Sequence, residues 1–451
     1  MVNDRKEKLR KLGAEVLAEA LLELASRDDM AEALLTRLLA PAGSAKPRIE
    51  GQLKALYRDD RYYDWQSVDV LASKLHMILS DISSSIQDPE LGVDLVLRFY
   101  EADAAVLGRC DDSDGYIGDI YRIEAPELFQ RYAKGLTDKE SLLARLRILI
   151  ASDEYGVRDN LLNDAHEWLT EPEMRLFAED NLACALADRD PHRRFHWSNM
   201  AETMASFLND GALFEHIRCA TSETLGAAAR ADMAEVHLAG GDHARALEML
   251  DQVAADDLFQ LGRRDQLRLK IYQQTGRKAD AEAVAWCIFS RCPGMVGLDR
   301  LLEVIGPSRR EEVIAREVER IQASSTFSLI DADFLLQTDN AARCAQYVEQ
   351  HAGQIDGRDY SYLPGLARDL KSQGHLLAAT IIFRTLLVSV LERGAVKAYR
   401  HGGAYLRQLT KLAPLIVDWK TLEEHEAFYQ HLQARHGRKR SFWAQVDDAE
   451  S

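Results

Sequence analysis

A glycine-rich turn recurs at regular intervals through the second half of this 451-residue sequence. The clearest copies are centred on Gly241, Gly276 and Gly374, and each separates the end of an apolar helical stripe from an alanine-containing helix start. Weaker turns near residues 307 and 339 complete the series, with successive spacings of 35, 31, 32 and 35 residues. A period in the low thirties is the length of one helix–turn–helix unit in tetratricopeptide-type arrays. This period restricts the fold more than any other feature of the chain.

The period predicts pairs of helices that stack side by side. A single two-helix unit leaves an apolar face uncovered, and the next unit buries that face. Glycine lets the chain leave a helix in a left-handed conformation that other residues resist. Small residues after each glycine, such as Ala246 and Ala281, allow helices to approach closely. The full tetratricopeptide consensus is absent, so we describe the predicted array over residues 201–415 as tetratricopeptide-like.

The remainder of the chain is also predicted to be helical. Glycine (26) and proline (10) are scarce for this length, and a fold with many β-turns would need more of both. Apolar residues recur at helical spacing, and no segment alternates convincingly as a strand would. We therefore expect an all-α protein, a solenoid of helical hairpins that is tetratricopeptide-like in its C-terminal half. Its predicted parts are an N-terminal helical hairpin (1–40), an irregular helical domain (48–200), the repeats (201–415) and a C-terminal capping helix and tail (416–451).

The charge balance disfavours non-specific binding to nucleic acid or to an anionic membrane. The chain has 73 Asp and Glu against 56 Lys and Arg, which gives a formal net charge of −17. Its most apolar segment, residues 376–391, is interrupted by Arg384 and is shorter than a membrane span, so it predicts a buried helix. The first apolar stretch carries three glutamates, which an export signal would exclude. We expect a cytoplasmic protein with no membrane partner and with six reduced cysteines.

The segment CDDSDGYIGD, residues 110–119, has some features of a calcium-binding loop. Such a loop needs oxygen ligands at positions 1, 3 and 5, glycine at position 6 and glutamate at position 12. Aligning Asp112, Asp114 and the next glycine to positions 3, 5 and 6 puts a cysteine at position 1 and a tyrosine at position 12. Two ligands are therefore missing. We predict a polar turn between helices, and a weak cation site formed by Asp112, Asp114 and Asp119 is the alternative.

Other pairs of reactive side chains favour a structural role. His192 and His196 are four residues apart and would share a helix face, but the glutamate of an HExxH motif is absent and no cysteine is near. Cys287 and Cys292 are five apart, so one helix would not point both the same way. The chain has no phosphate-binding glycine loop and no GxSxG motif. We predict no catalytic residue, cofactor or metal, although dispersed catalytic residues leave no such signature.

Two segments near the C-terminus are candidates for contact with a partner. In AYRHGGAYLRQL (398–409), helical spacing favours packing on the helix predicted at 376–391. The alternative is a ligand surface formed by Tyr399, Arg400 and His401.

The second candidate is the basic, aromatic tail HGRKRSFW, residues 436–443. A helix is predicted to begin at Thr421 with a capping box to Glu424 and to end at Gly437. The Phe442–Trp443 pair is then expected to fold back as a plug on the last apolar face. Contact with an acidic partner is the alternative, and association with nucleic acid is a further one that the overall charge disfavours. Both alternatives would use Arg438, Lys439, Arg440 and Trp443.

Several segments resemble an uncharacterised family of bacterial proteins that is expected to be helical along its whole length. The likeness covers most of the chain, and its most distinctive pieces are the DSDG turn and the HGRK…FW tail. The segments are LGAEVLAEALLELA (12–25), DWQSVDVLASKLHMIL (64–79), DSDGYIGDIYR (112–122), EYGVRDNLL (154–162), AYRHGGAYL (398–406) and HGRKRSFW (436–443).

The resemblance implies no activity, cofactor or catalytic residue, because that family has none assigned. The chain is also distantly similar to the helical region attached to SWIM-type zinc-finger proteins, but it contains no CxC with which their zinc motif begins. Together these observations predict a non-catalytic helical scaffold whose concave surface binds a protein or peptide. The alternatives are an enzyme or a small-ligand or metal binder with dispersed residues, and a nucleic-acid-associated protein.

Overall fold

The structure is a computed structural model that describes residues 9–27, 31–32, 35, 39, 45–254 and 258–447. These residues form helices and contain no strand beyond an isolated bridge between Tyr63 and Cys110, so the predicted all-α class is confirmed. The chain divides into two compact units, Met1–Arg264 and Asp265–Ser451. Much of the predicted hairpin over 1–40 lies outside the described residues.

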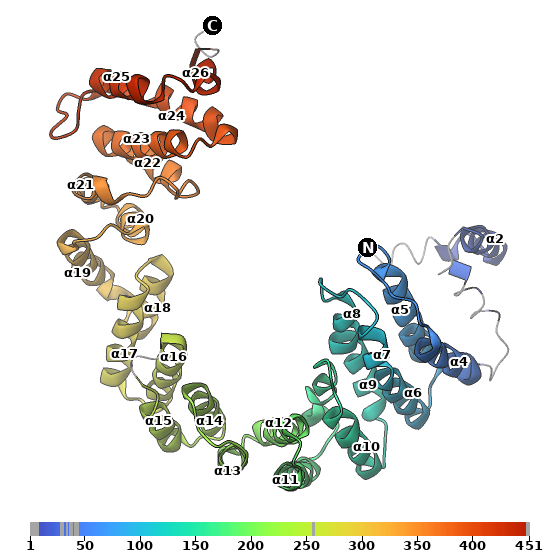
Figure 1. Cartoon of the computed structure of the whole chain (residues 1–451). Coiled ribbons are helices and arrows are strands. Elements are labelled where there is room, and N and C mark those ends of the chain that lie inside the picture. Colours follow the sequence, from blue (N-terminus) through green and yellow to red (C-terminus); the bar gives the residue numbers. More distant parts are fainter. Residues whose placement is uncertain are drawn as a thin grey trace. The chain divides into compact units, whose positions relative to one another are not determined.

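Unit 1 is a succession of helices joined mostly by short turns (Figure 1). Its described N-terminal part contains α2 (Ala14–Ala25), α4 (Ala45–Arg58), α5 (Val68–Ser85), α6 (Pro89–Glu101), α7 (Asp103–Leu107) and α8 (Tyr116–Asp119). A π-helical turn, Ile120–Glu124, follows α8 and precedes the other helices of unit 1. These are α9 (Ala125–Ala133), α10 (Lys139–Ala151), α11 (Glu171–Ala187), α12 (Pro191–Phe207), α13 (Gly211–Thr221), α14 (Ala227–Ala239) and α15 (His243–Asp251), with α16 (Leu258–Gln274) reaching the boundary between the units.

Helix α6 is buried on most of its surface and packs against α4, α5, α7 and α9. In the sequence, Asp88–Pro89 predicts the start of a helix over 89–106. The helix does begin there, with Pro89 in its first turn and the Asp88 carboxylate accepting the Glu90 N–H at 3.0 Å. The structure breaks this 89–106 helix at Ala102, between α6 and α7. The carboxylate of Asp103 bonds its neighbour's backbone N–H and a distant arginine, and such side-chain bonds compete with a continuous helix.

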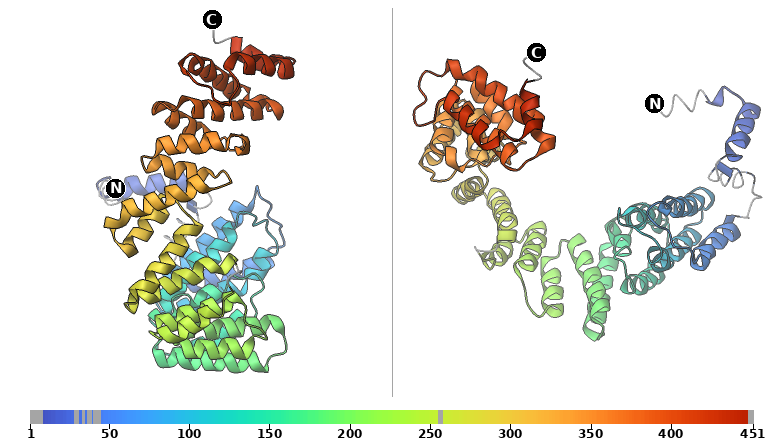
Figure 2. Two further views of the ribbon diagram at one scale, coloured as in Figure 1. Left: turned by 90° about the vertical axis from the view of Figure 1, so that its left-hand side faces the viewer. Right: turned by 45° about the horizontal axis from the view of Figure 1, so that its top comes forward.

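The described residues of unit 2 are also helical (Figure 2), and several neighbouring helices pack together, such as α17 with α18 and α22 with α23. Helix α23 is the counterpart of α6: most of its residues are buried, and it packs against α21, α22 and α24. The buried helix predicted at 376–391 is therefore confirmed. The helices are α17 (Lys278–Arg291), α18 (Met295–Ile305), α19 (Arg310–Ala323), α20 (Leu329–Gln337), α21 (Ala341–Gln350), α22 (Leu363–Ser372), α23 (Leu376–Glu392), α24 (Tyr399–Leu412), α25 (His425–His436) and α26 (Arg440–Asp447).

One corner geometry recurs at the predicted turns. Gly241, Gly276 and Gly374 have φ of +84°, +70° and +84°, and at each corner the residue after the glycine donates its N–H back to the carbonyl five residues before it. This is the bond that closes a Schellman motif. Asp339 takes the left-handed position in its own corner with φ of +59°, whereas the turn near residue 307 is a short 3₁₀ segment. The predicted left-handed helix ends are thus confirmed at the three glycines.

Two predicted boundaries differ from the structure. The boundary expected between residues 200 and 201 falls inside α12, which packs along its length on α11. The predicted capping box at Thr421 does not form, because α25 begins only at His425. The preceding segment, 413–424, instead runs over α23, where the carbonyl of Glu423 accepts a hydrogen bond from Arg384. No helix in the described part of the chain is both long and apolar enough to cross a bilayer.

Candidate functional site

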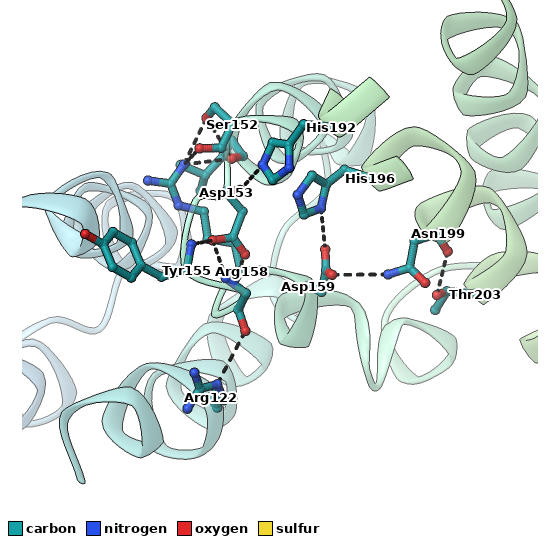
Figure 3. A network of polar contacts seen from close by, with 12 residues as sticks. Arg122, Ser152, Asp153, Tyr155, Arg158, Asp159, His192, His196, Asn199 and Thr203 are labelled. Carbon is teal, nitrogen blue, oxygen red and sulfur yellow. Dashed lines mark hydrogen bonds and ion pairs between the residues drawn. The ribbon is translucent and has the colours of Figure 1, made fainter. Parts of the chain in front are cut away.

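A polar network in unit 1 joins the segment after α10 to the start of α12 (Figure 3). Asp153 organises this segment: its carboxylate accepts the backbone N–H groups of Tyr155, Gly156 and Arg158 at 3.0, 3.0 and 2.7 Å. Three backbone donors on one buried carboxylate fix the local path of the chain.

Arg158 and Asp103 form a buried ion pair at the edge of this network. The guanidinium donates from Nε and Nη2 to the two carboxylate oxygens at 2.7 and 2.6 Å, and Nη1 donates to the carbonyl of Leu149 at 2.8 Å. The side chains are 7 % and 1 % exposed. Two charges at this depth are tolerated only when geometry and hydrogen bonds are complete, as they are here. The pair therefore fastens the 152–162 segment to α7.

Two histidines of α12 face the same segment. His192 Nε2 lies 2.6 Å from the carbonyl oxygen of Asp153, and His196 Nδ1 lies 3.3 Å from the carboxylate of Asp159, which also accepts a bond from Asn199. Asp159 raises the pKa of His196 above its ordinary value. Neither imidazole is bonded to a hydroxyl or thiol in the described part of the chain, and no cluster of three metal-binding side chains occurs there. The network can hold a proton and position a loop.

The Asp159–His196 pair predicts a pH-dependent contribution to stability. Because the pKa of His196 is raised from 6.5 in the folded state, the contribution is complete below about pH 6.5 and is lost as the pH rises through the folded-state pKa. We expect His196→Asn to cost more free energy of unfolding at about pH 6 than at about pH 8, measured by urea denaturation. The matched control is His216→Asn, an exposed histidine on α13. An equal cost at both pH values would contradict the prediction.

The π-helical turn contributes to the same region. Its Arg122 donates from Nε to the carbonyl of Gly156 at 3.3 Å, and the side-chain amide of Asn160 donates to the Arg122 carbonyl at 2.9 Å. Two segments quoted above for the family resemblance, 112–122 and 154–162, therefore meet in space. The side chains of both segments bond backbone carbonyls of the other segment. We therefore assign this contact a structural role in unit 1.

The DSDG turn is a helix start in the structure. Both carboxylate oxygens of Asp112 accept backbone N–H groups, from Ile117 at 2.7 Å and from Gly118 at 2.9 Å, at the beginning of α8. Asp114 and Asp119 are exposed, and neither belongs to a metal-binding cluster of the described residues. The polar turn expected from the sequence is what the structure contains.

The C-terminal tail is a plug on α24. Phe442 is fully buried, with its ring 5.7 Å from that of Tyr399, and the indole N–H of Trp443 donates to the carbonyl of His436 at 3.0 Å. At Gly402 an added Cβ would stand 3.1 Å from the ring of Phe442, so glycine permits this close approach. The plug predicted from the sequence is confirmed, and Tyr399 belongs to the core.

The basic residues of the tail remain at the surface. Arg438 and Arg440 are exposed and make no ion pair within the described residues. The Lys439 amine lies close to Gly394, 3.8 Å from the position of an added Cβ. Arg400 is likewise exposed. Of these cations, Lys439 lies beside the turn between α23 and α24.

A cavity of about 680 Å³ opens beside α23, and we call it the arginine cavity. Three arginines line it: Arg384 from the middle of α23, Arg393 from its end, and Arg358 from the segment before α22. Gly357 lets that segment approach, because a Cβ there would stand 2.5 Å from the Thr385 carbonyl oxygen. The remaining lining residues are Ala352, Ile355, Asp356, Thr385, Val388, Ser389 and Glu392.

A second cavity of about 300 Å³ shares Gly357 and Arg393 with the first, and we call it the aromatic cavity. It is lined by Tyr360, Tyr405 and His401, so one of the three ligand-surface residues predicted on α24 does reach a cavity. The other lining residues are Leu386, Val390, Ala395, Lys397 and Ala398. Unit 2 therefore presents a cationic hollow directly beside an apolar, aromatic one.

A family model matches residues 3–445, and its description is a family of unknown function, DUF6880. The chain belongs to DUF6880. No curated protein matches this DUF6880 chain, and no solved structure does. The resemblance to an uncharacterised family is confirmed, whereas a bacterial source and the likeness to SWIM-associated regions stay predictions.

The sequence predicts only part of the lining of the two cavities. His401 was a candidate, and Arg384 was visible as the one charge inside the most apolar helix. Arg358 and Tyr360 were missed because they lie in an irregular segment, 352–362, that has no periodic pattern. In the sequence, only the charged and aromatic side chains of GRDYSY, residues 357–362, mark this segment. They indicate a cavity lining only once the segment is known to lie against α23.

Proposed function

We propose that this DUF6880 protein is a non-catalytic helical scaffold that binds a protein or peptide segment in the cytoplasm. The observation that carries the proposal is the adjoining pair of cavities on unit 2. One cavity supplies positive charge and the other supplies apolar and aromatic surface, which together fit an acidic segment that carries a large apolar side chain.

A tetratricopeptide-like solenoid is the arrangement that we propose for the helices around these cavities. It is supported by the left-handed corners at Gly241, Gly276 and Gly374 and by the packing of consecutive helices. The exposed aromatic side chain of Tyr360 supports a binding role, since it lines the aromatic cavity and is 67 % exposed. Tyrosine supplies large contact area at low cost in conformational entropy.

Peptide arrays test the proposal. The full-length protein is incubated with an arrayed library of random peptides, and the best binders are resynthesised for fluorescence anisotropy. We expect them to be enriched in Asp or Glu beside an aromatic or aliphatic residue. Arg358→Glu and Tyr360→Ser are each expected to weaken binding by about tenfold or more, because a charge pair and an aromatic anchor are lost.

Matched controls make the same changes on unit 1. Arg189→Glu and Tyr62→Ser alter exposed residues outside both cavities and should leave affinity within about twofold of the unmodified protein. Binders without acidic residues, or an equal loss in the control variants, would contradict the proposal. A failure to select any binder would do so as well.

A further inference from the structure

The loop between α4 and α5, residues 59–67, exposes two large aromatic side chains. Trp65 is 72 % exposed, whereas the other five tryptophans of the chain, all of them in its described part, are buried or half-buried. Tyr62, three residues before it, is 63 % exposed. Tryptophan and tyrosine often anchor protein interfaces, because they bury large areas at little cost in side-chain entropy. The loop therefore has the composition of a binding surface.

Tyr63 holds this loop on unit 1. Its backbone N–H and carbonyl each form a hydrogen bond of 2.8 Å with the 109–111 segment, and its side chain is fully buried. Neighbouring side chains of an extended, bridged segment point to opposite faces, so burial of Tyr63 turns Tyr62 and Asp64 outward. The carbonyl of Asp64 then accepts the N–H of Ser67 at 3.0 Å and begins a turn. A loop fixed in this way loses little conformational freedom when it binds.

The loop is also acidic. Residues 59–67 contain three aspartates and one arginine. Asp60 and Asp64 are exposed, and neither forms an ion pair with another described residue. The arginine, Arg61, lies over the ring of Tyr63, 5.0 Å from its centroid. The two exposed aromatic side chains therefore stand beside two carboxylates that have no cation.

The aromatic cavity of unit 2 has the complementary chemistry. Its described lining contains two cations, Arg393 and Lys397, and no carboxylate. Both side chains are exposed, and neither forms an ion pair in the part of the chain that the structure describes. Tyr360 and Tyr405 supply aromatic surface. The cavity volume of about 300 Å³ is sufficient for one aromatic side chain such as that of Trp65.

We propose that the 59–67 loop of one copy of the chain binds the aromatic cavity of a second copy. Trp65 enters the cavity, and the two carboxylates of the loop face Arg393 and Lys397. The inference rests on the proposed function, since the loop is an acidic segment with a large apolar side chain, and it names that segment. One loop in one cavity buries a small area, so the association is weak and forms only at high protein concentration. Peptide experiments on dilute protein are therefore unaffected by it.

Sedimentation velocity of the full-length protein over a series of concentrations tests the inference. We expect self-association that grows with protein concentration and weakens at higher salt, because exposed charges contribute to it. Trp65→Ser and Tyr360→Ser are each expected to weaken self-association by about tenfold or more. Phe195→Ser, at an aromatic side chain that is 64 % exposed on α12, is the control and should associate like the unmodified protein.

A mixture of the two variants gives the sharper test. Trp65→Ser keeps an intact cavity and Tyr360→Ser keeps an intact loop, so the mixture is expected to form mixed pairs although neither variant associates with itself. Both side chains are exposed, so neither change should lower the melting temperature. A protein that stays monomeric at every concentration, or a mixture of these variants that does not associate, would overturn the inference.

The outcomes separate this inference from the proposed function. Array peptides that bind at the cavities, in a protein that does not self-associate, leave the proposed function standing and contradict only the inference. Self-association that both variants abolish and their mixture restores, without any array binder, supports the inference and contradicts only the proposed binding of another protein's segment.

Discussion

Asp103→Asn is expected to destabilise unit 1 by about 3–5 kcal/mol, because it leaves the buried guanidinium of Arg158 without its counter-charge. The pair is 1 % and 7 % exposed, so water cannot replace the lost carboxylate. The variant also weakens the attachment of the 152–162 segment, whose backbone is positioned beside this pair. Hydrogen exchange of the amides of α6 reports the loss, since that helix lies in the core of the same unit.

Asp94→Asn is the matched control. Its carboxylate contacts Arg98 and Arg145 at 3.0 and 2.7 Å, but these side chains are about one-third exposed. Solvent screens such pairs, and we expect a loss of less than about 1 kcal/mol. Equal losses of unfolding free energy for Asp94→Asn and Asp103→Asn would contradict the prediction that burial makes the Asp103–Arg158 pair the more important one.

Phe442→Ala is expected to destabilise unit 2 by about 3–5 kcal/mol, through lost burial and the cavity left under α24. The ring is fully buried against Tyr399 and the backbone of Gly402. Because α26 packs on α24, its amides and those of α24 should lose protection together in hydrogen exchange.

Phe195→Ala makes the same change at a side chain that is 64 % exposed on α12. It should alter stability by no more than about 0.5 kcal/mol. Loss of protection in α26 alone, with α24 unaffected, would show that the tail is an appendage and not a plug on the core.

Local signals in the sequence account for much of the secondary structure. In EPEMRLFAEDNLACALA, residues 171–187, apolar residues recur at helical spacing and predict α11 with its bounds. Asp88–Pro89 likewise predicts the start of α6, because capping and periodicity are properties of neighbouring residues. The break at Ala102 could not be predicted in this way. Asp103, directly after the break, pairs with Arg158, which is 55 residues away in the sequence and meets it only in the folded chain.

In the candidate site, too, some features can be predicted from neighbouring residues and others depend on the fold. Arg384 stands out in the sequence because a charge interrupts an apolar helix, but the sequence does not show that it bonds a backbone carbonyl instead of pairing with a carboxylate of the described residues. That fact depends on the path of 413–424 over α23, where the expected capping box at Thr421 gives way to contacts by Trp419 and Glu423. Burial and partners are tertiary properties, so they become visible only with the fold.

Hydrogen exchange with and without a bound peptide tests most directly whether the peptide binds at the two cavities. Hydrogen exchange of the full-length protein is compared with and without the tightest array peptide, at saturating concentration. We expect slower exchange in residues 352–362, in the second half of α23 and at the start of α24, with no change in the 59–67 loop of unit 1. Protection confined to unit 1, or none in 352–362, would contradict binding at the two cavities.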